Sequence, residues 1–183
     1  MKAVIVSWSR TGNTGKASRA LLDGLEESGM EVEFLQLHDA ADLDWFDYDL
    51  ICVAFPVYRW SPPQPVDEWL SNRFRVYGTE KQVKIGAPRI SGRHAVVLVT
   101  YSGPHTGIRE AVPAALYAEQ FFEHLGFTIF DPLYVVGEYH GSEARSLQGP
   151  LGDTRGRPNA RDLAEIHQRG REIGEEIRWV SRT

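Results

Sequence analysis

Residues 7–18 read SWSRTGNTGKAS, and they join an apolar run, KAVIV (2–6), to a segment with helical spacing, RALLDGLEESG (19–29). The stretch therefore connects a buried strand to a helix. It crowds hydroxyl side chains and glycines into one turn, directly before the free N–H groups and the positive end of a helix dipole. This composition at a helix N-terminus predicts a phosphate-binding loop.

The turn carries more donors than a simple cap requires. They are the hydroxyls of Ser9, Thr11 and Thr14 and the side-chain amide of Asn13. Gly12 lets the backbone approach a ligand closely. A P-loop would need glycine at position 10 and Ser or Thr at 17, where the chain has Arg10 and Ala17, and G-x-G-x-x-G is absent. The structural alternative is a capping turn without a ligand, but caps rarely use so many donors.

Apolar runs that suit strands alternate with helical patterns along the whole chain. Strands are expected at 2–8, 31–37, 50–55, 95–100 and 127–136, and helices at 13–27, around 66–70, at 110–125 and from 159 onward. This alternation predicts an α/β fold with a doubly wound, five-stranded parallel sheet and helices on both faces. Two long connections, 75–93 and 138–158, interrupt the rhythm.

Three local signals refine this expectation. Pro132 cannot donate to a strand ladder, so the fifth strand is expected at an edge of the sheet. Asn159 and Asp162 form a capping-box variant at the start of the last helix. That helix carries an apolar face for docking on the sheet, made of Leu163, Ile166, Ile173, Ile177 and Val180.

Length and composition indicate one domain over residues 1–183. The net charge of −5 disfavours a nucleic-acid partner, because such partners are bound by clustered Lys and Arg. The single Cys52 excludes an internal disulfide and a cysteine-based zinc site, and no metal site is predicted. No run approaches the roughly 20 apolar residues of a membrane span. We expect a cytoplasmic protein without a membrane partner.

Ligands of doubly wound sheets bind beyond the carboxyl ends of the strands, at the switch point of the strand order. The loops after the first, third and fourth strands are therefore expected to converge. Besides the phosphate loop, these are PVYRWSPPQP (56–65) and TYSGPHTG (100–107). Both contain aromatic residues, which stack well on flat rings. The residues alone indicate a phosphate and a flat ring bound together.

The run Ser9-Arg10-Thr11-Gly12-Asn13-Thr14 resembles the phosphate loop of the flavodoxin-like family, Ser/Thr-x-Thr-Gly-Asn-Thr. The match is complete, and the resemblance extends over nearly the whole chain. It implies the strand order 2-1-3-4-5 and a non-covalently bound FMN.

The resemblance also implies which residues bind this cofactor. Tyr58 and Trp60 would lie against the ring, with packing of Trp60 on a partner subunit or on the helix of Trp69 as the alternative. Backbone N–H groups near Ser102 and Gly103 would meet the pyrimidine edge, where donors favour the reduced flavin. The full predicted set is Ser9, Arg10, Thr11, Gly12, Asn13, Thr14, Pro56, Val57, Tyr58, Arg59, Trp60, Thr100, Tyr101, Ser102, Gly103 and His105.

The family contains two-electron reductases and one-electron carriers. Many carriers place a glycine beside the flavin, but 56–61 contains none, and carriers are often more acidic than this chain. The resemblance thus favours an FMN-dependent NAD(P)H oxidoreductase that passes electrons from NADH or NADPH to a quinone, flavin or similar small acceptor. The alternatives are a flavodoxin-type electron-transfer protein serving a redox partner, and an interaction module that has lost the flavin.

In the reductase interpretation the flavin carries the chemistry, and no side chain is assigned as catalytic. His105 and His140 are candidates for substrate contact, and His140 could reach a neighbouring active site in a homodimer or higher homo-oligomer. Arg145, Arg155 and Arg157 could meet a dinucleotide phosphate. The alternative for these arginines is a solvated surface or a contact between subunits.

Overall fold

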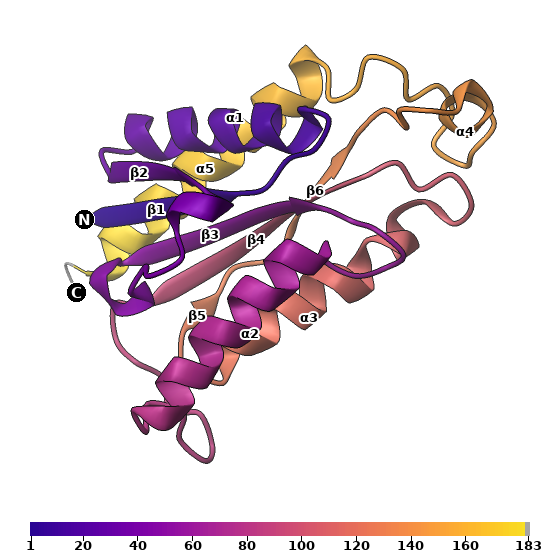
Figure 1. Cartoon of the computed structure of the whole chain (residues 1–183). Helices are drawn as coiled ribbons and strands as arrows, with labels where there is room; N and C mark the ends of the chain where they lie inside the picture. Colours follow the sequence, from indigo (N-terminus) through magenta and orange to yellow (C-terminus); the bar gives the residue numbers. More distant parts are fainter. Residues whose placement is uncertain (182–183) are drawn as a thin grey trace.

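A central sheet separates two pairs of helices in the computed structural model, which describes residues 1–181 (Figure 1). The strands are β1 (Lys2–Ser7), β2 (Glu31–Gln36), β3 (Leu50–Pro56), β4 (His94–Tyr101), β5 (Thr128–Ile129) and β6 (Leu133–Val136). The helices are α1 (Asn13–Glu27), α2 (Gln64–Thr79), α3 (Val112–Glu123), α4 (Glu143–Leu147) and α5 (Ala160–Val180). Helices α1 and α5 cover one face of the sheet, and α2 and α3 cover the other.

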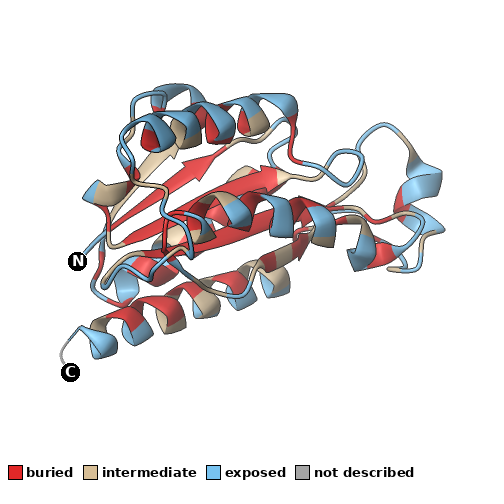
Figure 2. Cartoon of the chain, turned by 90° about the horizontal axis from the view of Figure 1, so that it is seen from below, coloured by how far each residue is buried: buried red, intermediate tan, exposed pale blue. Residues whose placement is uncertain are grey.

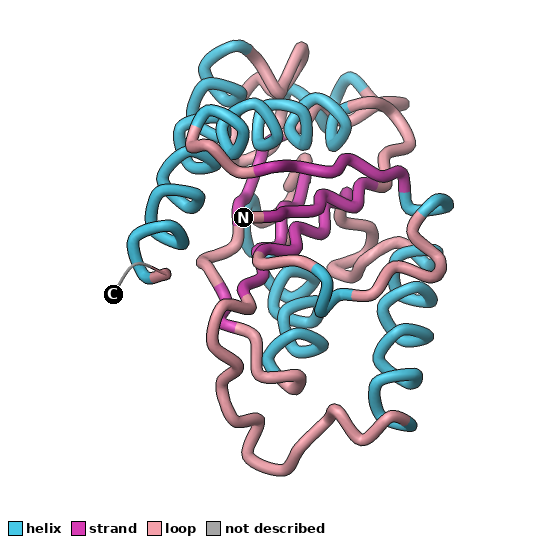
Figure 3. The backbone as a smooth tube through the Cα atoms, turned by 90° about the vertical axis from the view of Figure 1, so that its left-hand side faces the viewer, coloured by secondary structure: helices cyan, strands magenta, loops and turns pink. Residues whose placement is uncertain are grey.

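Every pairing between these strands is parallel, and the order is β2-β1-β3-β4-β5, with β6 also paired to β4. The predicted doubly wound sheet and its strand order are confirmed. The strand arrows of Figure 1 start on the side of the molecule where the N-terminus lies, and Figure 3 looks onto this side. The carboxyl ends of the strands therefore lie together at the opposite end of the sheet.

The expected fifth strand, 127–136, is divided into two short strands. β5 pairs with the first residues of β4, His94 opposite Thr128, and β6 pairs with its last residues, Tyr101 opposite Val136. Pro132 lies in the break between them, where its missing N–H removes no ladder bond. The edge position is as predicted, but the strand is not continuous.

Two predicted connections contain helix. α2 continues to Thr79 and so takes up the first five residues of the segment 75–93. Tyr77 explains this extension, because its buried ring packs 5.3 Å from Trp45 and anchors the last turn of the helix. In the segment 138–158 the short helix α4 was not expected.

Strands β3 and β4 are buried along almost their whole length (Figure 2), and apolar side chains pack on both faces of the sheet, as their largely apolar sequences predict. Under α2 and α3 the core centres on Trp45, which is fully buried. Its ring lies 4.6 Å from Phe122 and 5.3 Å from Trp69, within the range of favourable aromatic pairs. The core under α1 and α5 is aliphatic.

Helix α5 begins with the predicted capping box of Asn159 and Asp162. Its apolar face is buried as far as Ile177, but Val180 is 57% exposed, so the predicted stripe is one residue too long. Most of the remaining surface of the helix is polar, but Trp179 is 71% exposed. Neither α5 nor any other helix within residues 1–181 is long and apolar enough to cross a membrane.

Glycines bring α1 and α5 into direct backbone contact. A Cβ built on Gly24 would lie 2.0 Å from the carbonyl oxygen of His167, and one on Gly170 would lie 2.7 Å from that of Leu21. A Cβ on Gly174 would lie 2.0 Å from the side-chain oxygen of Ser28, the residue that follows α1. The two helices therefore pack at a distance that only glycine permits at these three positions.

Glu119 is a buried carboxyl group on α3. Only 8% of the residue surface is exposed, and its Oε1 has no hydrogen-bond partner. Burial raises the pKa of this carboxyl group from 4.5 to about 7, and repulsion from Glu123 and Asp131 adds to the shift. Between these two values the folded protein keeps a proton that the unfolded chain releases. Stability therefore falls as the pH rises through this window.

We expect Glu119→Gln to stabilise the protein at pH 8 by up to about 3 kcal/mol and at pH 5 by less than about 1 kcal/mol. Glutamine has no charge to bury at either pH, whereas the carboxyl group ionises between them. Urea unfolding at both pH values measures the difference. Glu26→Gln, on the exposed side of α1, is the control. An equal effect of Glu119→Gln at both pH values would contradict the assignment.

Candidate functional site

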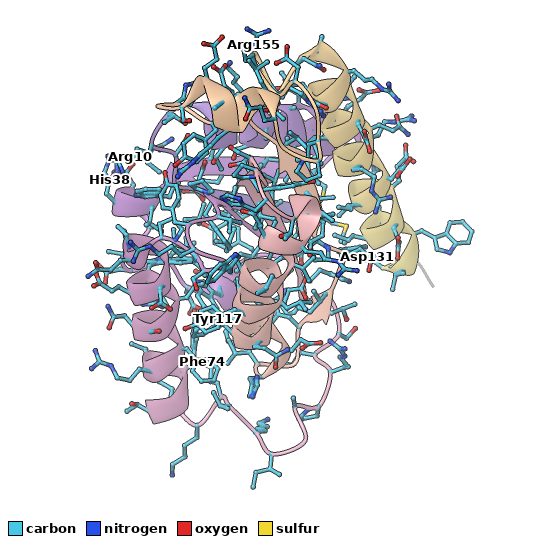
Figure 4. The ribbon with its side chains drawn as sticks, turned by 90° about the vertical axis from the view of Figure 1, so that its right-hand side faces the viewer. Arg10, His38, Phe74, Tyr117, Asp131 and Arg155 are labelled. Carbon is cyan, nitrogen blue, oxygen red and sulfur yellow. The ribbon has the colours of Figure 1, made fainter. Side chains whose placement is uncertain are left out.

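The loops at the carboxyl ends of β1, β3, β4 and β6 surround one cleft of about 840 Å³, and Figure 4 looks onto this end of the molecule. The volume lies within the roughly 300–1,000 Å³ typical of ligand pockets. The wall consists of Arg10, Thr11, Pro56, Val57, Tyr58, Arg59, Trp60, Thr100, Tyr101, Ser102, Gly103, Pro104, His105, Glu110, Gly137, Glu138, Tyr139, His140 and Arg145.

Most of the predicted binding residues meet in this wall. All those predicted within 56–60 and 100–105 line the cleft, and so do both candidate substrate contacts, His105 and His140. From the first loop, only Arg10 and Thr11 do. The other predicted residues of that loop, which are Ser9, Gly12, Asn13 and Thr14, are not part of the wall.

The first loop ends in an N-terminus of α1 that no side chain caps. Gly12 occupies the N-cap position with a φ of 94°, in the left-handed region that glycine tolerates. No side chain accepts a cap hydrogen bond there, and the first turn contains no acidic residue. The Ser9 hydroxyl accepts from the Gly12 N–H, 3.1 Å away, and so shapes the loop. By contrast, α5 has a complete capping box.

Asn13 and Thr14 connect this loop to the rest of the site. The Thr14 hydroxyl lies 2.7 Å from that of Thr100, and both residues are buried. The Asn13 side-chain amide donates to the carbonyl oxygen of Glu138, 3.1 Å away. These bonds hold the first loop against β4 and the loop after β6. Direct donation from these two side chains to a phosphate stays a prediction.

The loop after β3 forms a tight hairpin. Tyr58 and Ser61 exchange two backbone hydrogen bonds of 3.0 and 3.1 Å. Between them, Arg59 and Trp60 have φ values of 49° and 64°. Two successive positive φ values are typical of a type I′ turn, which normally uses Gly, Asn or Asp. Non-glycine residues held in this region cost roughly 1–3 kcal/mol each.

The hairpin presents aromatic side chains at the cleft. Trp60 is 62% exposed, so it does not pack into the helix of Trp69, which was one predicted alternative. The rings of Trp8 and Tyr58 pack in a T-shaped arrangement, with ring centroids 6.1 Å apart. Burial raises the pKa of the Tyr58 hydroxyl, and the hydrogen bond with Arg10 opposes this rise. Tyr58 is thus fixed by two neighbours, whereas the Trp60 ring is open to a ligand.

The loop after β4 depends on a glycine. Gly103 has a φ of 52°, and a Cβ there would lie 2.7 Å from the carbonyl oxygen of Gly107. The Glu110 carboxylate accepts from the N–H groups of His105 and Thr106, at 2.7 Å each. The loop is therefore closed on itself, with a fixed backbone facing the cleft.

The loop after β6 supplies wall residues that the sequence did not single out for the ring. The Arg145 guanidinium donates to the Tyr139 hydroxyl and lies 4.8 Å from the centroid of that ring. The topology could have indicated Tyr139 and Arg145 as wall residues, since the loops that follow all parallel strands of one sheet lie at the same end of that sheet. Of the other two arginines in 138–158, Arg155 pairs with Asp153 and Glu143, and Arg157 with Asp162.

Known proteins resemble the chain in sequence and in structure. No protein-family model matches the sequence. A curated relative, an FMN-dependent NADH:quinone oxidoreductase from Shewanella amazonensis, is 29% identical over 151 residues, which cover 81% of this chain and 71% of that protein. A solved archaeal flavodoxin superposes with a TM-score of 0.66 at 17% identity, over 97% of this chain and 99% of the flavodoxin.

The chain has the flavodoxin-like fold. A WrbA-like flavodoxin protein from Agrobacterium tumefaciens has the same fold, with a TM-score of 0.59 at 12% identity over 97% of this chain and 98% of that one. The flavodoxin-like fold explains why the three predicted loops meet. Within residues 1–181, no three His, Cys, Asp or Glu side chains are grouped as metal ligands.

Proposed function

We propose that this protein binds FMN in the cleft and transfers electrons from NADH or NADPH to a quinone, flavin or similar small acceptor. One observation carries the proposal: an uncapped helix N-terminus adjoins a cleft walled by exposed aromatic side chains. An anion and a flat ring are the two parts of a flavin mononucleotide. The relatedness to an FMN-dependent NADH:quinone oxidoreductase supports the same conclusion.

The residues of the first loop fit a phosphate. The N–H groups opening α1 and the helix dipole attract an anion. Arg10 and Thr11 line the adjoining cleft and add a guanidinium and a hydroxyl. Because no acidic residue lies in the first turn of α1, no carboxylate there competes with the ligand.

The remaining wall residues fit the ring. Trp60 and Tyr58 offer aromatic surface on one side, and backbone N–H groups around Ser102 and Gly103 are the proposed donors to the pyrimidine edge. Bound FMN would supply the redox chemistry, accepting two electrons as hydride from the nicotinamide and passing them to the acceptor. The protein would position both reactants.

A reductase is favoured over an electron carrier by the hairpin and by the relative. The hairpin contains no glycine, whereas many carriers have one beside the flavin. Its two positive φ values fall on Arg59 and Trp60 instead, so this backbone is already fixed in a costly conformation. The carrier remains the second candidate, because solved flavodoxins share the fold.

Spectra of the protein with FMN and each nicotinamide test this proposal. We expect the purified protein to be yellow or to become so with added FMN, and anaerobic NADH or NADPH to bleach it within seconds. A flavin that both nicotinamides leave oxidised, but that a reducing protein partner bleaches, would indicate the carrier. A protein that does not bind FMN at all would refute both.

A further inference from the structure

The cleft contains three guanidinium groups that no carboxylate neutralises. Among residues 1–181, Arg10 is bound to Tyr58, Arg145 is bound to Tyr139, and Arg59 has no ion pair. A tyrosine ring orients a guanidinium through cation–π and hydrogen-bond contacts but leaves its charge in place. The arrangement therefore differs from that of Arg155, outside the wall, which two carboxylates already bind.

The two carboxylates of the wall are already engaged by the backbone. Glu110 accepts from the N–H groups of His105 and Thr106, at 2.7 Å each. Glu138 accepts from the N–H of Gly156, 2.9 Å away. Neither acid forms an ion pair with an arginine of the wall in the described part of the chain. The carboxylates of the wall therefore do not neutralise its three guanidinium groups.

These charges come from separate elements. Arg10 belongs to the loop at the N-terminus of α1 and, under the proposed function, accompanies the FMN phosphate. Arg59 lies in the strained hairpin beside Trp60, and Arg145 lies on α4 beside Tyr139. Two cations and the ring of Tyr139 therefore remain in the same cleft for the second occupant. Arginine binds sulfonate, carboxylate and phosphate oxygens with paired hydrogen bonds.

We infer that the electron acceptor of this protein is a planar aromatic anion, whose charged group is bound by Arg59 and Arg145. The inference rests on the proposed function and adds the acceptor's charge to it. A neutral quinone would use the aromatic wall alone. An anionic one would gain charge-assisted hydrogen bonds in addition, each worth a factor of roughly 10 or more in affinity.

Calorimetric binding of two redox-inactive probes tests the anion site without turnover. The FMN-loaded protein is titrated with naphthalene-2-sulfonate and with neutral 2-naphthol. We expect the wild type to prefer the sulfonate by at least about 10-fold, and the double variant Arg59→Gln/Arg145→Gln to lose this preference. Arg155→Gln, in the same surface segment but already paired, should keep it. Equal affinities in the wild type, or a preference that survives in the double variant, would overturn the inference.

Steady-state reduction of 1,4-naphthoquinone and its 2-sulfonate then tests the acceptor role, with rates expressed per bound flavin. In the double variant, kcat/KM should fall about 10-fold more for the sulfonate than for the neutral quinone. A rise confined to the KM of NADH would assign the arginines to the dinucleotide and refute the inference. If the sulfonate probe binds as expected but the wild type reduces neither quinone, the anion site stands and the proposed function fails.

Discussion

Thr11→Asp is expected to weaken FMN binding by at least about 100-fold while leaving the FMN-free protein as stable as before, or more stable by up to about 1 kcal/mol. Thr11 is exposed, lines the cleft and lies next to the uncapped start of α1. A carboxylate here interacts favourably with the helix dipole. The same carboxylate repels a phosphate dianion, and like charges brought together in a binding site cost several kcal/mol.

The opposite signs of the two effects make this variant informative. Fluorescence titration of FMN measures the affinity, and urea unfolding without FMN measures the stability. Thr11→Asn is the control, because it has nearly the same shape as aspartate but no charge, and it should retain most of the affinity. If aspartate binds FMN as well as asparagine does, the phosphate does not lie at this helix end.

Gly24→Ala is expected to destabilise the fold by about 3 kcal/mol or more, although a single methyl group is added. The new Cβ would lie 2.0 Å from the His167 carbonyl oxygen, which belongs to the backbone of α5 and cannot turn aside. Helices α1 and α5 would have to separate, and the aliphatic side chains between them and the sheet would lose packing contacts. Chemical denaturation of the purified variant gives the loss directly.

Gly78→Ala is the matched control within a helix. A Cβ at Gly78, near the end of α2, meets nothing within 4 Å. Alanine there should raise stability by up to about 1 kcal/mol, because it has the higher helix propensity. If both alanine variants are stabilised, α1 and α5 are not in backbone contact. If both are destabilised alike, helix crowding is not the cause.

The sequence was sufficient for the sheet and for most element boundaries. Residues 13–27 follow helical spacing and form a helix with these bounds, and the predicted capping box is present at Asn159. Such features depend on neighbours within one turn or one strand. The break before β6 was missed because strand spacing continues across Pro132, and only the pairing with β4 reveals the interruption.

The site was less predictable, since its contacts join distant residues. Thr14 and Thr100 meet across 86 positions, and Asn13 reaches Glu138 across 125. No local pattern distinguishes a hydroxyl that faces a ligand from one that fastens two loops together. Tyr139 and Arg145 likewise became recognisable as wall residues only when the chain after β6 was seen beside the other loops.

The turn at Arg59 and Trp60 is strained but fixed. The entropy cost of ordering its backbone is therefore incurred during folding and not during ligand binding. A flexible loop would lose its conformational freedom at the moment a ligand arrives, and that loss would subtract from affinity. Here folding has already selected one backbone shape, held by the paired hydrogen bonds of Tyr58 and Ser61. This part of the wall is therefore preorganised, and recognition by it is closer to lock-and-key than to induced fit.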